Sequence, residues 1–74
     1  MKEYTFHQFS FLDREYEYGL IFSLYDISPG WHENYLIPIH DWCYNFGRDR
    51  VMAAGTHFYF KTIEDMNWFM LRWS

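Results

Sequence analysis

The chain has 74 residues, of which 50% are hydrophobic and 26% are aromatic, and its ten acidic and six basic side chains give a net charge of −4. This length predicts a single domain over residues 1–74, and the hydrophobic content excludes an intrinsically disordered chain. No apolar run approaches the roughly 20 residues that span a bilayer, and the N-terminus lacks a secretory pattern. One cysteine excludes an internal disulfide, and the acidic excess argues against direct binding of nucleic acid.

The first third of the chain predicts two strands. The aromatic residues of 4–11 change parity near His7 and Gln8, which indicates either a bulge or a strand covered on both faces. Residues 12–14 are then expected to turn the first strand into a second over 15–25. Apolar side chains alternate along that second strand, as in a strand with one buried face: Tyr16, Tyr18, Leu20, Phe22 and Leu24.

A breaker cluster at 26–30 ends this hairpin, and a short helix is predicted after it. Pro38 suits the first turn of a helix and Gly47 its C-terminal cap. Four residues between them share one helical face: Ile39, Trp42, Cys43 and Phe46. Residues 31–37 favour neither helix nor strand.

A second hairpin is predicted over 50–54 and 56–61 around Gly55, followed by a helix over 63–73. Thr62 suits the N-cap of that helix, with Asp65 as a capping partner or a favourable charge at its N-terminal end. The residues expected to dock on the sheet are Ile63, Met66, Phe69, Met70 and Trp73. The order ββαββα predicts an α+β fold, with about four antiparallel strands and helices on one face.

The last helix also carries apolar residues on its opposite side, where Trp68 and Leu71 lie near Glu64 and Arg72. One interpretation is that residues 31–37 fold over Trp68. A second is that Arg72 stacks on Trp68, since the two are one helical turn apart. A third is a partner-binding surface, because Trp and Arg are enriched in the energetically dominant residues of interfaces.

Tyrosines and carboxylates alternate along the predicted second strand. Its phenols either belong to a half-buried strand that reaches solvent or form a protein-binding surface with acidic rims. The candidate partner-binding residues in this region are Glu15, Tyr16, Glu17, Tyr18 and Asp26. Trp31, which follows the hairpin, is a further aromatic residue that we expect to be exposed.

No pattern in the chain indicates catalysis, a metal or a cofactor. The four histidines are scattered, and a zinc site needs three or four converging ligands. His40 and Cys43 are the one pair with a spacing worth testing for nucleophilic catalysis, but Cys43 falls on the apolar helical face, where a cysteine behaves as a small buried hydrophobe. We therefore expect a protein that is not an enzyme.

The C-terminal third resembles small uncharacterised proteins of tailed bacteriophages. The resemblance rests on Phe58-Tyr59-Phe60, Glu64-Asp65 and the run Phe69-x-Leu71-Arg72-Trp73, and it covers residues 56–74. Met66 departs from it, because a small residue is expected there. The resemblance implies an accessory protein in the cytoplasm of an infected host cell and supplies no catalytic residue.

These observations lead to the hypothesis of a non-enzymatic viral protein that binds and inhibits a host protein or a defence complex, such as a CRISPR effector or another nucleic-acid enzyme. Exposed aromatic rings would fill pockets on the target, and the carboxylates would meet its basic residues. Two alternatives stay open. One is a homo-oligomer, such as a homodimer, that buries the aromatic surface against its own copies, and the other is a protein that stacks a nucleotide-like ligand between its rings.

Overall fold

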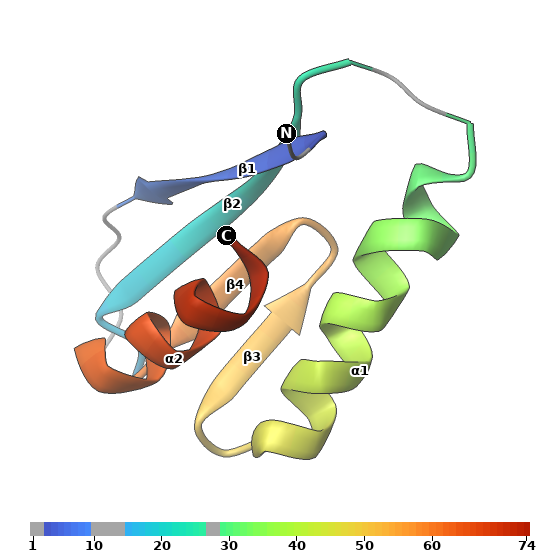
Figure 1. Cartoon of the computed structure of the whole chain (residues 1–74). Helices are drawn as coiled ribbons and strands as arrows, with labels where there is room; N and C mark the ends of the chain where they lie inside the picture. The colour runs from blue at the N-terminus through green and yellow to red at the C-terminus, as the bar shows by residue number, and fades with distance from the viewer. Residues whose placement is uncertain (1–2, 10–14, 27–28) are drawn as a thin grey trace.

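The computed structural model describes residues 3–9, 15–26 and 29–74, and it confirms the α+β class and the ββαββα order (Figure 1). The elements are β1 (Tyr4–Phe9), β2 (Tyr18–Leu24), the π-helical turn η1 (His32–Leu36), α1 (Ile37–Phe46), β3 (Val51–Ala54), β4 (His57–Phe60) and α2 (Ile63–Trp73). The four strands form one antiparallel sheet in the order β1-β2-β4-β3. Strands β1 and β3 are therefore its edges.

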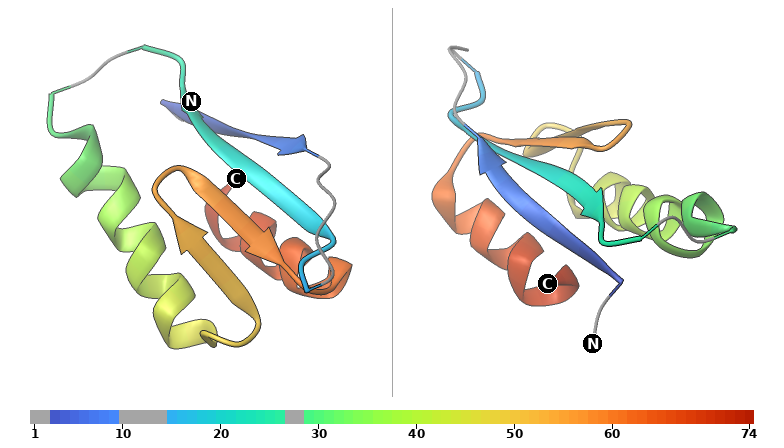
Figure 2. Two further views of the ribbon diagram at one scale, coloured as in Figure 1. Left: turned by 180° about the vertical axis from the view of Figure 1, so that it is seen from behind. Right: turned by 90° about the horizontal axis from the view of Figure 1, so that it is seen from above.

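Both helices pack against the same face of the sheet (Figure 2). The fully buried ring of Phe58 demonstrates this arrangement, because its centroid lies 5.5 Å from the His40 ring on α1 and 5.1 Å from the Phe69 ring on α2. The core residues are Leu20, Phe22, Leu36, Ile39, Cys43, Val51, Phe58, Phe60, Met66 and Phe69. Each large side chain buried in this way contributes about 1.5–3 kcal/mol, so a few aromatic rings supply much of the stability of a chain without disulfides.

Strand β1 is regular, and the predicted bulge near His7 and Gln8 is wrong, because β1 pairs with β2 without interruption. The parity change has another cause. Phe9 lies on the face opposite the helices, over Gly19, where an added Cβ would lie 2.4 Å from Cζ of Phe9. Strand β2 begins at Tyr18, later than predicted. Phe11 and the predicted turn at 12–14 lie outside the described residues.

The helix that ends at Phe46 begins earlier than the sequence indicates. The segment 31–37, for which no structure was predicted, forms η1 and runs directly into α1, and the N–H of Ile37 donates to the carbonyl of His32. Pro38 is tolerated near the start of α1, where its missing N–H is least costly. Gly47 ends α1 with φ 148°, a backbone conformation that glycine adopts most easily, and this confirms the predicted cap.

The second hairpin and α2 follow the predicted pattern closely. Gly55, with φ 60°, stands at the first position of a two-residue turn between β3 and β4, as in a type II′ hairpin. Thr62 caps α2, since its hydroxyl accepts a hydrogen bond from the N–H of Asp65 at 3.2 Å. The expectation that Ile63 docks on the sheet is wrong, because its side chain is exposed.

An ion pair between a buried aspartate and an exposed arginine joins the start of α2 to the residue before β3. Asp65 is 5% exposed and accepts hydrogen bonds from Arg50, at 2.5 Å from Nη2 and 3.3 Å from Nε. The bond to Asp65 raises the pKa of the Arg50 guanidinium, which also lies 4.3 Å from the centre of the Phe46 ring. The Asp65 carboxylate thus holds the start of α2 against the start of β3 through charged hydrogen bonds.

Candidate functional site

The outer side of α2 carries the most prominent exposed apolar residues of the predicted site. Trp68 is 59% exposed and Leu71 is 78% exposed, whereas Phe69 between them is fully buried. Three helical residues turn through about 300°, so Trp68 and Leu71 project about 60° apart on one side of the helix. Glu64, Asn67 and Arg72 are exposed around them. We call these five residues the α2 outer face.

Neither structural interpretation of Trp68 holds. Residues 31–37 do not cover it, since Trp31 packs on the sheet and Leu36 is in the core. The Arg72 guanidinium lies 4.1 Å from the centre of the Trp73 ring and not over the indole of Trp68. Among the described residues, Trp68 has neither a ring contact nor a cation contact, so its indole is available to a partner.

Two of the aromatic residues expected to be exposed belong mainly to the core. The Trp31 ring stacks on that of Phe22, with 6.1 Å between centroids and 18° between planes, and it is half-buried. Tyr18 is also half-buried against the core. The predicted exposure of Trp31 is wrong, because its ring packs on Phe22 of the sheet. Tyr18 agrees with the alternative of a half-buried strand, since β2 directs it toward the helices.

The acidic and tyrosine residues of 15–26 do not form one continuous ridge. Glu15, Tyr16 and Glu17 precede β2, whereas Asp26 follows it, so the seven residues of β2, about 20 Å of extended chain, separate the two groups. The Tyr16 ring lies 6.3 Å from the Tyr59 ring and 5.6 Å from Nζ of Lys61, which is two residues before α2. The first group is therefore next to the start of α2, and Asp26 is at the other end of the sheet.

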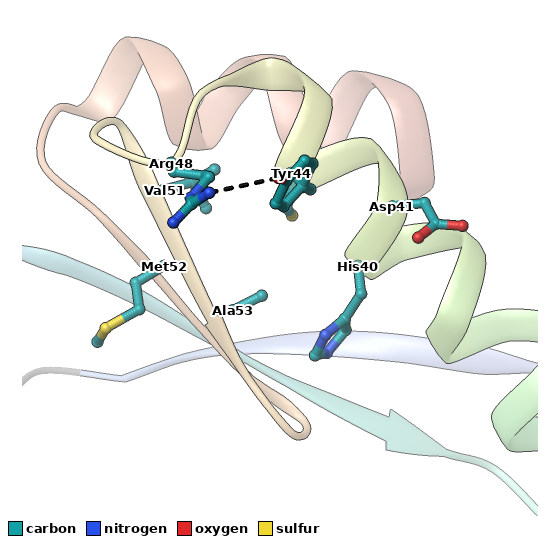
Figure 3. A pocket seen from close by; sticks show the side chains of 8 residues that line it. His40, Asp41, Tyr44, Arg48, Val51, Met52 and Ala53 are labelled. Atoms are coloured by element: carbon teal, nitrogen blue, oxygen red, sulfur yellow. Dashed lines mark hydrogen bonds between the residues drawn. The ribbon is translucent and has the colours of Figure 1, made fainter.

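A second surface feature lies between α1 and the edge strand β3 (Figure 3). It is a cavity of about 390 Å³, lined by His40, Asp41, Cys43, Tyr44, Arg48, Val51, Met52 and Ala53. A smaller cavity of about 290 Å³ shares His40 and Asp41 with it and extends to Gly55. The larger cavity borders β3 at the edge of the sheet, the smaller one adjoins it at His40 and Asp41, and we call the two together the β3 groove.

The groove contains the pair considered for catalysis, and its geometry does not favour that role. Nε2 of His40 lies 2.7 Å from the carbonyl oxygen of Gly55, so this nitrogen is engaged by the hairpin turn. Burial raises the pKa of the Cys43 thiol to about 12, which keeps it protonated and unreactive at neutral pH. Within the described residues, no three His, Cys, Asp or Glu side chains converge as a metal site would require.

The face of the sheet opposite the helices has an aromatic cluster that sequence reasoning missed. The Phe9 ring contacts those of His57 and Tyr59 edge-on, at 5.6 and 5.8 Å between centroids, and Tyr16 meets Tyr59 from the side. The signal was present in the parity of β4, where Tyr59 alternates with two buried phenylalanines. The cluster fills the space over Gly19 and accounts for several of the surplus rings.

No protein-family model matches the chain, and neither the curated proteins nor the solved structures contain a match. The described part of the chain has no helix long and apolar enough to span a membrane.

Proposed function

We propose that the protein is a non-enzymatic binding protein that docks on another protein through the α2 outer face. The observation that carries this proposal is the exposure of Trp68 beside Leu71 on a helix whose other side is anchored in the core. A rigid helix holds the indole in place, so little conformational entropy is lost when a partner covers it. The neighbouring Arg72 and Glu64 would supply the polar rim that surrounds an apolar centre in many interfaces.

The size of the protein is compatible with this role. A typical stable interface buries about 800 Å² on each partner, which is about one-sixth of the 5172 Å² that this chain exposes. Residues 15–17 are on another side of the molecule, because Tyr16 meets Tyr59 on the sheet face opposite the helices, so the interface proposed here uses the α2 outer face without them. Asp26 lies at the other end of β2 and would not take part.

The narrower form of the proposal is an accessory protein of a bacteriophage that blocks a nucleic-acid enzyme or a defence complex of the host. Its support is the excess of ten acidic over six basic residues and the resemblance of residues 56–74 described above. A carboxylate beside an apolar anchor, as Glu64 is beside Trp68, suits a partner whose own surface is basic, as surfaces that bind nucleic acid are. The mechanism would be occlusion of that surface, without any chemical step.

The proposal is tested by affinity capture from bacterial lysate with three forms of the protein. These are the wild type, the double variant Trp68→Ala with Leu71→Ala, and Tyr25→Ala, a control that removes an equally exposed ring from the far end of β2. We expect the wild type and Tyr25→Ala to retain the same protein and the double variant to lose it. Equal capture by all three forms, or capture by none, would refute this assignment of the surface.

Sedimentation of the purified wild type distinguishes the homo-oligomer. A monomer at micromolar concentration agrees with a foreign partner. A stable dimer that the double variant abolishes would show that α2 binds a second copy, and the proposal of a foreign partner at this surface would fail.

A further inference from the structure

The β3 groove has a backbone lining that can be assigned from the hydrogen bonds of the sheet. The N–H of Phe22 donates to the carbonyl of Thr56 at 2.8 Å. Backbone groups alternate in direction along an antiparallel strand, so Thr56 faces β2, while His57 and Tyr59 face β3. This fixes which residues of β3 use their backbone inside the sheet.

The β3 residues opposite His57 and Tyr59 are Ala54 and Met52, and their N–H and C=O groups therefore face β4. Ala53, between them, directs both its N–H and its C=O away from the sheet. Ala53 also lines the larger cavity, so this donor and this acceptor open into the groove. The N–H of Val51 is already used, since it donates to the carbonyl of Gly47.

The walls and the ends of the groove differ in chemistry. The exposed side chains of Tyr44, on α1, and Met52, on β3, provide apolar walls on its two sides (Figure 3). Arg48 lies near the start of β3 and donates a hydrogen bond to the Tyr44 hydroxyl at 3.3 Å. Asp41 lies toward the other end, where the two cavities meet, and among the described residues it forms no ion pair.

We propose that the β3 groove binds an extended peptide segment of a partner protein, which adds to the sheet as a strand next to β3. The backbone of the segment would pair with the N–H and C=O of Ala53, as in other cases of strand addition. Its side chains would alternate between the walls and solvent, and one Lys or Arg would reach the Asp41 carboxylate.

Charge favours this occupant over a second copy of the chain. Asp41 forms no ion pair with any described residue, so its end of the groove attracts one basic side chain, whereas Arg48 lines the other end. A second copy of the chain would bring a further net charge of −4. The N–H and C=O of Ala53 are complementary to the backbone of an extended chain, which a compact small molecule does not offer. The site lies on α1 and β3 and uses no residue of α2, so it goes beyond the function proposed above.

The test uses a degenerate library of acetylated and amidated hexapeptides, selected for binding to the immobilised full chain. The selected sequences are expected to carry Lys or Arg at one fixed position and β-branched residues at alternate positions. In amide NMR spectra of the labelled protein, the selected peptide should shift the Ala53 signal and slow its hydrogen exchange. N-methylation of the peptide amide that pairs with Ala53 should weaken binding about tenfold or more, because it removes a hydrogen bond and adds a clash.

Matched variants of the protein separate the groove from other surfaces. Ala53→Pro removes an N–H that faces outward, so the hairpin should fold while peptide binding is lost. Ala54→Pro removes a bond to β4 and should unfold the hairpin. Asp41→Asn should weaken binding of the Lys peptide about two- to fivefold, as expected for an exposed ion pair. Tyr25→Ala, outside the groove, should bind the peptide as the wild type does.

Three results would overturn the proposal. The first is a selection that enriches no peptide sequence. The second is a selected peptide that shifts amides of α2 or of the open sheet face and leaves Ala53 unchanged, or that still binds after N-methylation. The third is a dimer in sedimentation that Ala53→Pro dissociates, since this would make a second copy the occupant of the β3 edge.

Discussion

Substitution of two neighbouring residues of α2 by alanine should change the stability of the protein by very different amounts. Phe69 is fully buried, and Trp68 is 59% exposed. Four described rings lie within 6 Å of the Phe69 ring, centroid to centroid: Phe6 at 5.0 Å, Phe58 at 5.1 Å, Phe60 at 5.3 Å and Trp42 at 5.9 Å. Phe69→Ala removes all four contacts and leaves a cavity between α1, α2 and the sheet. Trp68→Ala removes a ring that has no such neighbours among the described residues.

The magnitudes follow from this difference in burial. A buried Phe→Ala change costs about 3–5 kcal/mol. A chain of 74 residues has a total free energy of unfolding of about 4–11 kcal/mol, so Phe69→Ala should remove a large part of it. Trp68→Ala should change the free energy of unfolding by about 0.5 kcal/mol or less, as other exposed substitutions do.

Urea unfolding followed by far-UV circular dichroism measures both effects, and it does not depend on the fluorescence of the tryptophan that is removed. With a slope near 1 kcal/mol per molar urea for a chain of this size, the midpoint of Phe69→Ala should fall by about 3 M or more. That of Trp68→Ala should move by about 0.5 M or less. A loss above about 2 kcal/mol for Trp68→Ala would show that the indole is structural and would refute its assignment to a binding surface.

Three further predictions concern the interior and the turns. The raised pKa of Cys43 means that the folded state binds the thiol proton more tightly than the unfolded state does. The resulting contribution to the free energy of unfolding is complete below pH about 9 and is lost as the pH rises toward 12. The stability of Cys43→Ala should therefore depend less on pH in this window, and an unchanged dependence would contradict the burial of the thiol. Arg50→Met should cost about 1–3 kcal/mol in urea unfolding, because Asp65 stays buried without its partner, and a neutral result would show that water replaces the guanidinium. Gly55→Ala should cost about 1 kcal/mol, since φ is 60° there and no neighbour clashes with an added methyl group; a gain in stability would exclude the type II′ turn.

Residues with local signals allowed the second half of the fold to be predicted. Thr62 as N-cap, the buried positions of Met66 and Phe69, and Gly55 in a two-residue turn all act within a few residues, so their consequences can be derived from the sequence. The same helical periodicity places Trp68 on the side of α2 opposite the core, but whether residues 31–37 cover it could not be predicted from the sequence.

Other features depend on contacts between distant segments and were therefore not predictable. The position of Trp31 depends on Phe22, and the parity change at Phe9 reflects a ring placed over Gly19, which belongs to the next strand. Asp65 was expected to act within its own helix, but Arg50 binds it from the residue before β3. Pro38 obscured the continuity of 32–36 with α1, because the residue directly before a proline disfavours the helical conformation, which Ile37 nevertheless adopts.

The β3 groove could not be predicted from the sequence for a different reason. Its central feature is the direction of the N–H and C=O of Ala53, and the pattern of side chains does not indicate the direction of backbone groups. Its walls depend on how far α1 lies from β3, which the sequence of either element does not determine. A strand order that places β3 at the edge was needed before this surface could be recognised.

The most direct test of the central claim is the affinity of the captured partner, measured by calorimetry with the wild type and with Trp68→Ala. Loss of an indole at the centre of an interface costs about 2 kcal/mol or more, so binding should weaken about 30-fold or more while the urea midpoint stays nearly constant. Tyr25→Ala should bind with unchanged affinity. An affinity of Trp68→Ala equal to that of the wild type would contradict the claim that the α2 outer face is where the protein binds.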